Sequence, residues 1–268
     1  MSSLNNGGIS LIISTYNWPQ ALNLCLKSVR NQNFLPDEVI IADDGSSDET
    51  RKLIEQYQRE FPVPIHHVWQ PDEGFQLAKI RNKAIASASK DYIIQIDGDL
   101  ILDKNFIKDH LTFRQANTFV SGSRVIMNKE LSDRLLASGS IDVPLSSKGL
   151  ENVFNGLRIP FLSRVMKDYK QKDIYYIRGC NMAFWRNDLL RVNGYNEAFV
   201  GWGREDNEIG SRLINLGVRK RIIKFSGIVY HICHKEKTRT SLDTNDQVLQ
   251  LTISKRLTYC EKGLSQHL

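Results

Sequence analysis

The sequence predicts an α/β fold in a single domain, with a mainly parallel, Rossmann-like sheet flanked by helices. Short apolar segments rich in β-branched residues alternate with segments of helical periodicity over residues 9–96. This alternation is typical of right-handed crossovers between parallel strands. Polar clusters follow three of the apolar segments, at the sheet edge where such folds bind ligands. The chain has 268 residues, which is sufficient for one large domain.

Apolar periodicity predicts the elements of the N-terminal part. Buried strands are expected over residues 9–13, 38–42, 64–69 and 92–96, because each is a short apolar run. Helices are expected over residues 19–31 and 76–88, with another after residue 47. Ser46 and Glu49 have the spacing of a capping box that begins this middle helix.

The pattern is weaker in the C-terminal part. A short helix is expected near residues 133–136, a loop over 138–147, and a return to regular structure at 174–177. Further helices are expected near residues 187–190 and over 204–216, a last strand over 228–230, and a helical tail over 241–268. In the helix over residues 204–216, Leu216 belongs to the apolar face, and Glu208 with Arg212 form a surface ion pair.

Composition and cysteine usage indicate the cellular compartment in which the protein is expected. Apolar residues make up 41% and charged residues 25%, which is ordinary for a globular protein. The four cysteines are scattered without a CxxC pair, which indicates free thiols in a reducing compartment. We find no signal peptide and no apolar run near the roughly 20 residues that span a bilayer. A cytoplasmic protein is expected, with peripheral attachment to the inner face of the cell membrane as an option.

The chain is basic, with a net charge of +6 and a pI of about 9.1. Part of this charge is concentrated in Arg219, Lys220, Arg221, Lys224, Lys235, Lys237 and Arg239, with Glu236 the only acid among them. Two interpretations stay open: a solvated basic edge, or a surface that faces an anion such as a phosphorylated substrate or anionic lipid. No nucleic-acid-binding motif accompanies the charge, so we expect no nucleic acid partner.

Two carboxylates separated by one glycine follow the apolar run at residues 92–96. Asp97 and Asp99 could hold a divalent cation beside a phosphate group, and hard oxygen ligands suit Mg²⁺ or Mn²⁺. Asp and Gly are also common in turns, so an ordinary turn is the alternative. Either His231 or His234, after the last predicted strand, could complete the metal site, or could simply be hydrogen-bonded.

A second acidic cluster, residues 43–48, follows the second predicted strand. One of its acids could accept hydrogen bonds from a nucleotide base or ribose. Because Asp43 and Asp44 are adjacent, we expect at most one of them to face the cleft. Helix capping is the alternative role for this cluster.

A third acidic pair, Glu205 and Asp206, lies in the first turn of a predicted helix. The helix dipole favours ionised carboxylates there, which suits a base that accepts a proton. Trp202 stands between Gly201 and Gly203, just before the pair. A large ring between two glycines indicates a hinged loop that closes over a ligand.

Taken together, these motifs resemble those of inverting glycosyltransferases of family 2, which have the GT-A fold. The resemblance rests on residues 14–17, 43–46 and 97–99 after the first, second and fourth predicted strands. The C-terminal half resembles the catalytic module of β-1,4-galactosyltransferases, polypeptide GalNAc-transferases and bacterial chondroitin polymerases, through residues 178–181, 201–206 and His231. The resemblance as a whole extends over residues 9–237. Arg204 departs from the pattern of this module, because the animal galactosyltransferases carry glycine at that position. Arg204 would either stiffen the loop or reach a phosphate.

The resemblance implies a role for each motif residue. Residues 9–120 would bind the nucleotide sugar, and residues 121–240 would bind the acceptor and carry out catalysis. Asp206 would be the catalytic base, and Glu205 would bind the acceptor sugar. The nucleotide sugar would contact Thr15, Tyr16, Asn17, Asp44, Arg81, Asp97, Gly98 and Trp202. The metal, Mn²⁺ or Mg²⁺, would be held by Asp97, Asp99 and His231, with His234 as the alternative histidine. Trp202 would also touch the acceptor.

The implied function is transfer of a hexose or N-acetylhexosamine from a UDP-sugar to a hydroxyl of a glycan or lipid-linked glycan acceptor. Synthesis of a bacterial surface polysaccharide or lipopolysaccharide is the implied setting. A sugar-nucleotide nucleotidyltransferase is an alternative, but the loop at residues 14–18 is neither glycine-rich nor basic. The non-catalytic alternative is a polysaccharide-binding module that stacks tryptophans on sugars.

Overall fold

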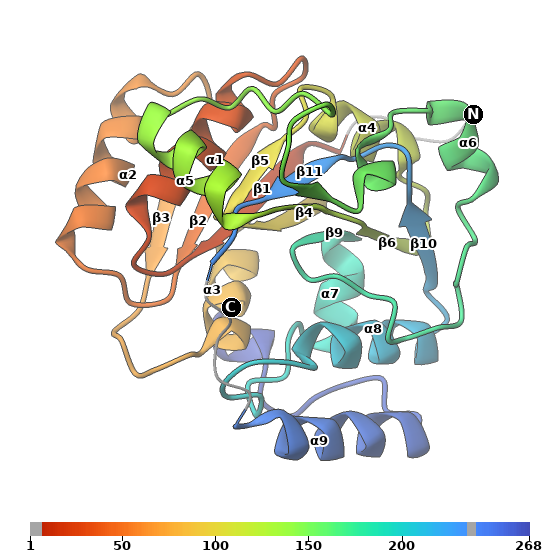
Figure 1. The fold of residues 1–268 in the computed structure, drawn as a ribbon. Helices are drawn as coiled ribbons and strands as arrows, with labels where there is room; N and C mark the ends of the chain where they lie inside the picture. The colour runs from red at the N-terminus through yellow and green to blue at the C-terminus, as the bar shows by residue number, and fades with distance from the viewer. Residues whose placement is uncertain (1–6, 235–239) are drawn as a thin grey trace.

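The computed structural model describes residues 7–234 and 240–268 (Figure 1). The main sheet has the strand order β10 (Arg219–Ile223), β6 (Thr118–Gly122), β9 (Asn181–Trp185), β4 (Tyr92–Asp97), β1 (Ile9–Thr15), β2 (Glu38–Asp43) and β3 (Ile65–Trp69). Adjacent strands are parallel except at β9, which runs antiparallel to β4 and β6. The predicted α/β fold with a mainly parallel sheet is therefore confirmed.

Helices cover both faces of this sheet (Figure 1). One layer contains α1 (Pro19–Arg30), α2 (Asp48–Glu60), α4 (Phe106–Phe113) and α5 (Lys129–Ser138). The other contains α3 (Leu77–Ser87), α7 (Arg186–Val192) and α8 (Glu205–Asn215), with α9 (Leu242–Ser254) outside α8. Three short helices complete the list: η1 (Val153–Gly156), α6 (Pro160–Val165) and η2 (Leu264–Gln266). No helix in the described ranges is long and apolar enough to cross a membrane.

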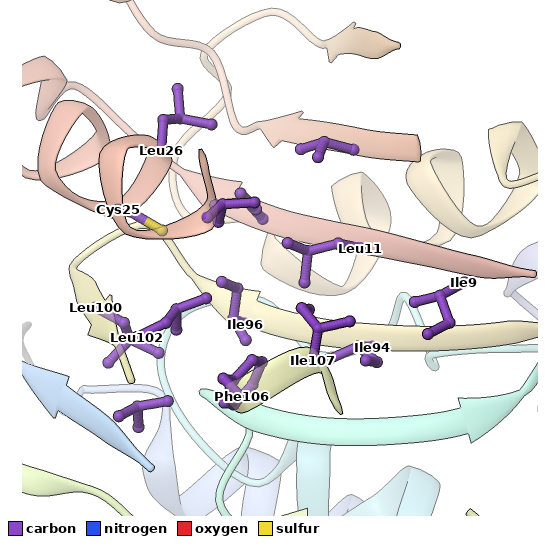
Figure 2. Close-up of a cluster of buried hydrophobic side chains, with 14 of the residues drawn as sticks. Ile9, Leu11, Cys25, Leu26, Ile94, Ile96, Leu100, Leu102, Phe106 and Ile107 are labelled. Carbon is purple, nitrogen blue, oxygen red and sulfur yellow. The ribbon is translucent and has the colours of Figure 1, made fainter. Parts of the chain in front are cut away.

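The central strands are buried on both faces, which explains their continuous apolar sequence. Successive side chains of a strand point to opposite faces. Accordingly Leu11 and Ile13 of β1 pack against α1 and α4, whereas Ile12 joins the core beneath α3 and α8. Figure 2 shows the first of these cores, where Leu26 of α1 and Phe106 of α4 lie among strand side chains.

A second, smaller sheet extends from the end of β4. Its strand order is β5 (Leu100–Leu102), β11 (Val229–His231), β7 (Val125–Met127) and β8 (Leu150–Glu151). β11 pairs with β5 in antiparallel register, so that His231 lies opposite Leu100. This pairing brings the end of β11 next to the residues that follow β4.

The predicted capping box at Ser46 is wrong. The N-cap of α2 is Ser47, and no side-chain hydrogen bond caps the helix. Ser46 is buried, and its hydroxyl instead accepts a hydrogen bond from the backbone N–H of Asn17 at 2.8 Å. The hydroxyl of Ser46 therefore links two loops at the sheet edge.

Residues 174–177 do not resume regular structure, but form a turn. Tyr175 and Tyr176 lie outside the sheet, and cationic side chains lie over their rings, Arg204 at 5.1 Å and Lys170 at 4.6 Å from the ring centroids. The strand follows later, as β9. Strands β6 and β10 lie in stretches where the sequence pattern predicts no strand. Leu216 is the C-cap of α8, and it packs, half-buried, against the same core as Ile209 and Leu213, as predicted.

Glu208 and Arg212 form an ion pair, but not on the surface as predicted. Their side chains are 1% and 0% exposed, and two hydrogen bonds of 2.8 and 2.7 Å join them. Arg212 also donates to the carbonyl of Gly194, and Glu208 accepts from Thr252 of α9. The pair thus ties α8 to the end of α7 and to α9.

Replacing Arg212 with methionine should lower the free energy of unfolding by about 3–5 kcal/mol, because Glu208 would be left as a buried charge without its cation. Urea denaturation measures this change. Lys129→Met is the matched control, because Lys129 and Asp133 have the same spacing but are exposed; the control should lose no more than about 1 kcal/mol. A loss for Arg212→Met as small as that of the control would contradict the proposed role of the pair.

Candidate active site

The carboxyl ends of β1, β2 and β4 meet at one edge of the main sheet. Ser14 lies opposite Asp97, and Thr15 lies opposite Asp43, in the parallel registers of β1 with its two neighbours. The backbone N–H of Asp44 donates to the carbonyl of Thr15 at 3.0 Å. The loops after these strands therefore line one site, as expected for an open parallel sheet.

The loops after β1 and β2 are held in place by side-chain hydrogen bonds. Asp44 accepts from the side chain of Gln70 at 2.7 Å and from the backbone of Gln76 at 2.9 Å. Burial raises the pKa of Asp44, against the effect of these two bonds. Tyr16 is partly exposed and donates to Asp72 at 2.8 Å. Both residues predicted to contact the nucleotide therefore lie at this edge with fixed orientations.

Asp43 does not compete with Asp44 for the same space. Asp43 is fully buried, lies 2.9 Å from His67 and accepts from the backbone of Ser46 at 2.8 Å. These bonds stabilise the turn that carries residues 44–47. Asp43 therefore supports the loop from within.

Arg81 of α3 lies at the centre of the site. Its guanidinium is 1% exposed, donates to Asp97 at 3.1 Å and donates to Asp206 at 2.9 Å. It also lies 3.9 Å from Glu205. Burial alone would lower the pKa of Arg81, but the neighbouring charges, that of Asp206 first, raise it. Arg81 therefore remains a cation and links the end of β4 to the start of α8.

The acidic pair begins α8. The carboxylate of Asp206 accepts from Arg81 and from the hydroxyl of Tyr195 at 3.2 Å, both at Oδ1. Its other oxygen, Oδ2, packs against Gly179. A Cβ atom on Gly179 would lie 1.8 Å from that oxygen, so only glycine fits there. Asp206 is thus oriented from two sides, and its hydrogen bonds leave Oδ2 for a ligand.

Glu205 has a different environment from its neighbour. Its side chain is 9% exposed, and its buried Oε2 has no hydrogen-bond partner among the residues that the structure describes. Burial, and then the charge of Asp206, raise the pKa of Glu205 to about 8. Burial therefore opposes the helix dipole, which favours an ionised carboxyl at this position. A buried, unpaired oxygen facing the site can bind a ligand hydroxyl.

Three of the four predicted metal ligands lie together. The ligand atoms of Asp99, His231 and His234 are all within 4.8 Å of one another. Oδ2 of Asp99 lies 3.5 Å from Nε2 of His231 and 3.2 Å from Nε2 of His234. Oδ1 of Asp99 is buried and has no hydrogen-bond partner among the described residues.

This cluster fits a divalent cation. Ligand atoms at about 2.1 Å from a metal lie about 3 Å from one another in an octahedral arrangement, close to the spacings found here. One carboxylate with two imidazoles is a donor set for a divalent first-row transition metal, the class that includes Mn²⁺. Although burial opposes it, the hydrogen bond from His234 and the charges of both histidines lower the pKa of Asp99, which favours an ionised ligand. Both histidines flank Asp99, and the carboxylate of Asp97 turns to Arg81 instead.

The loop before α8 has a backbone that favours glycine at three positions. Gly201, Gly203 and Arg204 have φ values of +79°, +107° and +77°. A left-handed arginine is strained by roughly 1–2 kcal/mol. Arg204 forms an ion pair with Asp246 of α9 at 2.9 Å, which holds it in this conformation. Its side chain points to α9 and Tyr175, which favours the first of the two alternatives, a stiffer loop.

Comparison with known protein families agrees with this geometry. The model of glycosyl transferase family 2 matches residues 10–191, which include the loops after β1, β2 and β4. The model described as the N-terminal domain of galactosyltransferase matches residues 162–235, which include Gly179, the acidic pair and His231.

The chain belongs to glycosyl transferase family 2.

Its C-terminal part carries the galactosyltransferase-type module. The chondroitin synthase of Escherichia coli is 26% identical over 242 residues, which cover 84% of this chain and 34% of the synthase. The chain thus spans about a third of the length of that relative. The predicted membership of family 2 with this module is confirmed.

Solved structures show the same fold. Residues 1–349 of TarS from S. aureus, in complex with UDP, align with a TM-score of 0.65 at 17% identity, covering 97% of this chain and 68% of that one. The mannosyltransferase PcManGT from Pyrobaculum calidifontis, in complex with GDP-Man and Mn²⁺, aligns with a TM-score of 0.60 at 16% identity, covering 86% and 58%. The GT-A fold expected for this family 2 chain is confirmed.

The predicted site residues of this glycosyltransferase chain fall into connected groups. Thr15 is the last residue of β1, and Tyr16, Asn17 and Asp44 lie on the loops after β1 and β2. Gly98 lies against β1: its N–H donates to the carbonyl of Ser14 at 2.7 Å. Trp202 is 40% exposed on the loop before α8. The roles of all of these residues stay predictions.

Two residues near the site carry no predicted role. Tyr195 orients Asp206 and is itself held by Gln95 at 2.9 Å. Burial lowers the pKa of the Arg124 guanidinium, but Cys180, and after it the charges of Asp97 and Asp99, raise it. No local sequence signal marks either residue, because only the tertiary fold brings these neighbours together.

Glu205→Gln should change how stability depends on pH in the metal-free protein. The pKa of Glu205 rises from 4.5 to about 8 on folding, so the folded state binds this proton more tightly. Its stabilising contribution is complete below pH 4.5 and is lost as the pH rises through about 8. Thermal unfolding should therefore show the parent losing stability relative to Glu205→Gln across this range.

Glu130→Gln is the control for this experiment, because Glu130 also lies in the first turn of a helix but is exposed. It should follow the parent at every pH. Parallel pH profiles of the parent and Glu205→Gln would show that the Glu205 carboxyl stays ionised in the fold.

Asp99→Asn and His231→Ala should each weaken Mn²⁺ binding by more than about tenfold, because each removes a ligand atom from the cluster. Calorimetric titration with Mn²⁺ in the presence of UDP measures this. His66→Ala, at an exposed histidine of β3, should bind Mn²⁺ like the parent. Equal affinity in all four proteins would rule out the cluster as the metal site.

Proposed function

We propose that this chain is an inverting glycosyltransferase that moves a hexose or N-acetylhexosamine from a UDP-sugar to a hydroxyl of a glycan acceptor. The observation that carries this proposal is the position of Asp206. The guanidinium of Arg81 lies 2.9 Å from that carboxylate and also binds Asp97, beside the cluster around Asp99. A base at this point can reach an acceptor hydroxyl while the donor diphosphate lies at the cation site.

The donor is proposed from the family and from the site. TarS binds UDP in its solved structure, and PcManGT binds GDP-Man with Mn²⁺. In this chain the loops with Tyr16 and Asp44 would bind the nucleoside. Mn²⁺ or Mg²⁺ held by Asp99, His231 and His234 would stabilise negative charge on the diphosphate. Arg124 adds a fixed positive charge at the same place.

The reaction follows from the orientation of the acidic pair. Oδ2 of Asp206 accepts the proton of the acceptor hydroxyl, while Oδ1 remains bonded to Arg81 and Tyr195. The hydroxyl oxygen bonds to the anomeric carbon from the face opposite the diphosphate. The bond from that carbon to the diphosphate oxygen breaks, and UDP leaves with the electron pair. One displacement inverts the configuration without a covalent enzyme intermediate.

Glu205 and Trp202 are proposed to bind the acceptor. The unpaired Oε2 of Glu205 would bond a sugar hydroxyl. Trp202 is exposed beside it on the loop that α9 holds through Asn245, whose side chain donates to the carbonyl of Gly203 at 2.9 Å. In this arrangement residues 9–120 bind the donor and residues 121–240 bind the acceptor. The likeness to a chondroitin synthase supports an acceptor in bacterial polysaccharide or lipopolysaccharide synthesis.

A hydrolysis screen tests the proposal, since transfer to water needs no known acceptor. The parent with Mn²⁺ should release UDP from one of a panel of UDP-sugars, and EDTA should stop the release. Asp206→Asn should bind UDP and Mn²⁺ like the parent but release UDP about 10²–10⁴-fold more slowly, because the base is lost.

Asp243→Asn is the matched control, since Asp243 is the second residue of α9 as Asp206 is of α8, but is exposed. It should hydrolyse like the parent. Parental turnover by Asp206→Asn would refute the base assignment, and full turnover in EDTA would refute the metal dependence. A protein that binds glycans but ignores every UDP-sugar would be a binding module.

A further inference from the structure

Large apolar side chains project from the segment that contains η1 and α6. Phe154 is 77% exposed, Phe161 78% and Val165 64%, and Ile159 is exposed as well. Phe161 and Val165 lie four residues apart on α6, so they share one side of that helix. Exposed apolar groups that cluster in this way indicate an interaction surface.

Cationic side chains are frequent in the same segment. Residues 158–172 contain Arg158, Arg164, Lys167, Lys170 and Lys172, against Asp168 alone. Arg164 is three residues after Phe161 on α6, and is exposed beside it. Apolar groups with a basic rim match the boundary between an acyl layer and anionic headgroups.

A cavity of about 260 Å³ opens next to the cluster, between the end of α4, α6 and β10. Its cationic lining consists of Arg114, Arg164, Lys167 and Arg221, together with the side chain of Gln115. Two of these cations, Arg164 and Lys167, belong to the segment with the exposed apolar groups. The cavity is therefore suited to an anionic group that arrives with an apolar one.

Arg221 is a buried hydrogen-bond donor in the wall of this cavity. Its side chain is 5% exposed, and Nη2 donates to Gln115 at 2.9 Å. Its buried Nε has no hydrogen-bond partner among the described residues and lies 3.6 Å from the carboxylate of Asp168. A buried N–H without an acceptor is unfavourable. The side chain of Arg221 thus contributes a positive charge to the wall of the cavity.

The segment is held firmly against the rest of the protein. The backbone N–H of Ile159 donates to the carbonyl of Phe225 at 2.9 Å, and that of Ile222 donates to the carbonyl of Lys167 at 2.9 Å. Arg158 forms an ion pair with the buried carboxylate of Asp109. The exposed side chains therefore project from an anchored backbone and need no large ordering on binding.

We propose that η1, α6 and the basic cavity beside them form a docking surface for an anionic lipid bilayer. Phe161, Val165 and Phe154 enter the interface, and a headgroup phosphate occupies the cavity. Charge complementarity favours a bilayer over a protein partner, because cations line both the apolar cluster and the cavity. This surface is independent of the proposed transfer reaction.

The surface differs from the basic stretch that the sequence singles out. Within that stretch Lys220 is buried, where its ammonium donates to the carbonyls of Asp173 and Tyr176, and it is not a solvated edge. Arg221 contributes to the cavity from inside. Lys235, Glu236, Lys237 and Arg239 lie outside the described residues.

Co-sedimentation with lipid vesicles tests the proposal. The parent should bind vesicles of phosphatidylcholine with phosphatidylglycerol, and should bind phosphatidylcholine alone more weakly. Phe161→Ser with Val165→Ser, and separately Arg164→Glu with Lys167→Glu, should each lower the partition coefficient by about tenfold or more. Added salt should weaken binding of the parent, because screening reduces the attraction of the cations.

Matched controls change the same residue types elsewhere. Lys52→Glu with Arg59→Glu alters two exposed cations of α2, and Phe34→Ser with Leu251→Ser alters two exposed apolar residues. Both control proteins should bind vesicles like the parent. All variants should retain the circular dichroism of the parent, and their UDP-sugar hydrolysis without vesicles should be unchanged, so failure of the proposed reaction would not affect this test.

Three outcomes would overturn the proposal. The parent could show no preference for vesicles that contain phosphatidylglycerol. The α6 variants could bind these vesicles as tightly as the parent. Alternatively, the parent could self-associate on size-exclusion chromatography without binding vesicles, with the Phe161 and Val165 changes abolishing that association; the surface would then cover a second copy of the chain.

Discussion

The site depends on one buried cation among several carboxylates. Asp97, Glu205 and Asp206 lie close enough to repel one another, and Arg81 is the guanidinium that hydrogen-bonds two of them and lies beside the third. Such a bidentate cation offsets the desolvation of the acids and orients them. Because Arg81 comes from α3, Asp97 from β4 and Asp206 from α8, this interaction also joins the two halves of the chain.

The packing around Asp206 leaves little room for substitution. Gly179 allows Asp206 to approach the backbone before β9, and Tyr195 fixes the carboxylate from the other side. The buried pair of Glu208 and Arg212 holds the rest of α8 against its neighbours. The base that we propose must be held within a fraction of an ångström of its working position, and rigid elements would supply that support.

The candidate metal site around Asp99 and the proposed docking surface both depend on the smaller sheet and the segments next to it. Pairing of β11 with β5 carries His231 to Asp99, and the backbone N–H of Ile232 donates to the carbonyl of Asp99 at 2.9 Å. The side chain of Asn155, within η1, donates to the carbonyl of Arg124 at 2.9 Å. The segment proposed to meet the bilayer is thus joined by short contacts to a cation of the site. Docking would set the orientation of the site relative to a lipid-linked acceptor.

Periodicity and local chemistry were enough to predict the strands and helices up to residue 97, since each central strand is buried on both faces and reads as an apolar run. They were also enough to identify the acids, histidines and loop that converge at the site as candidates, because the carboxyl ends of parallel strands share one edge of the sheet. They could not predict β6, β9 and β10, the burial of Glu208 with Arg212, or the raised pKa of Glu205. Each of these depends on neighbours distant in sequence, and only packing determines which charges lose water and which find a partner.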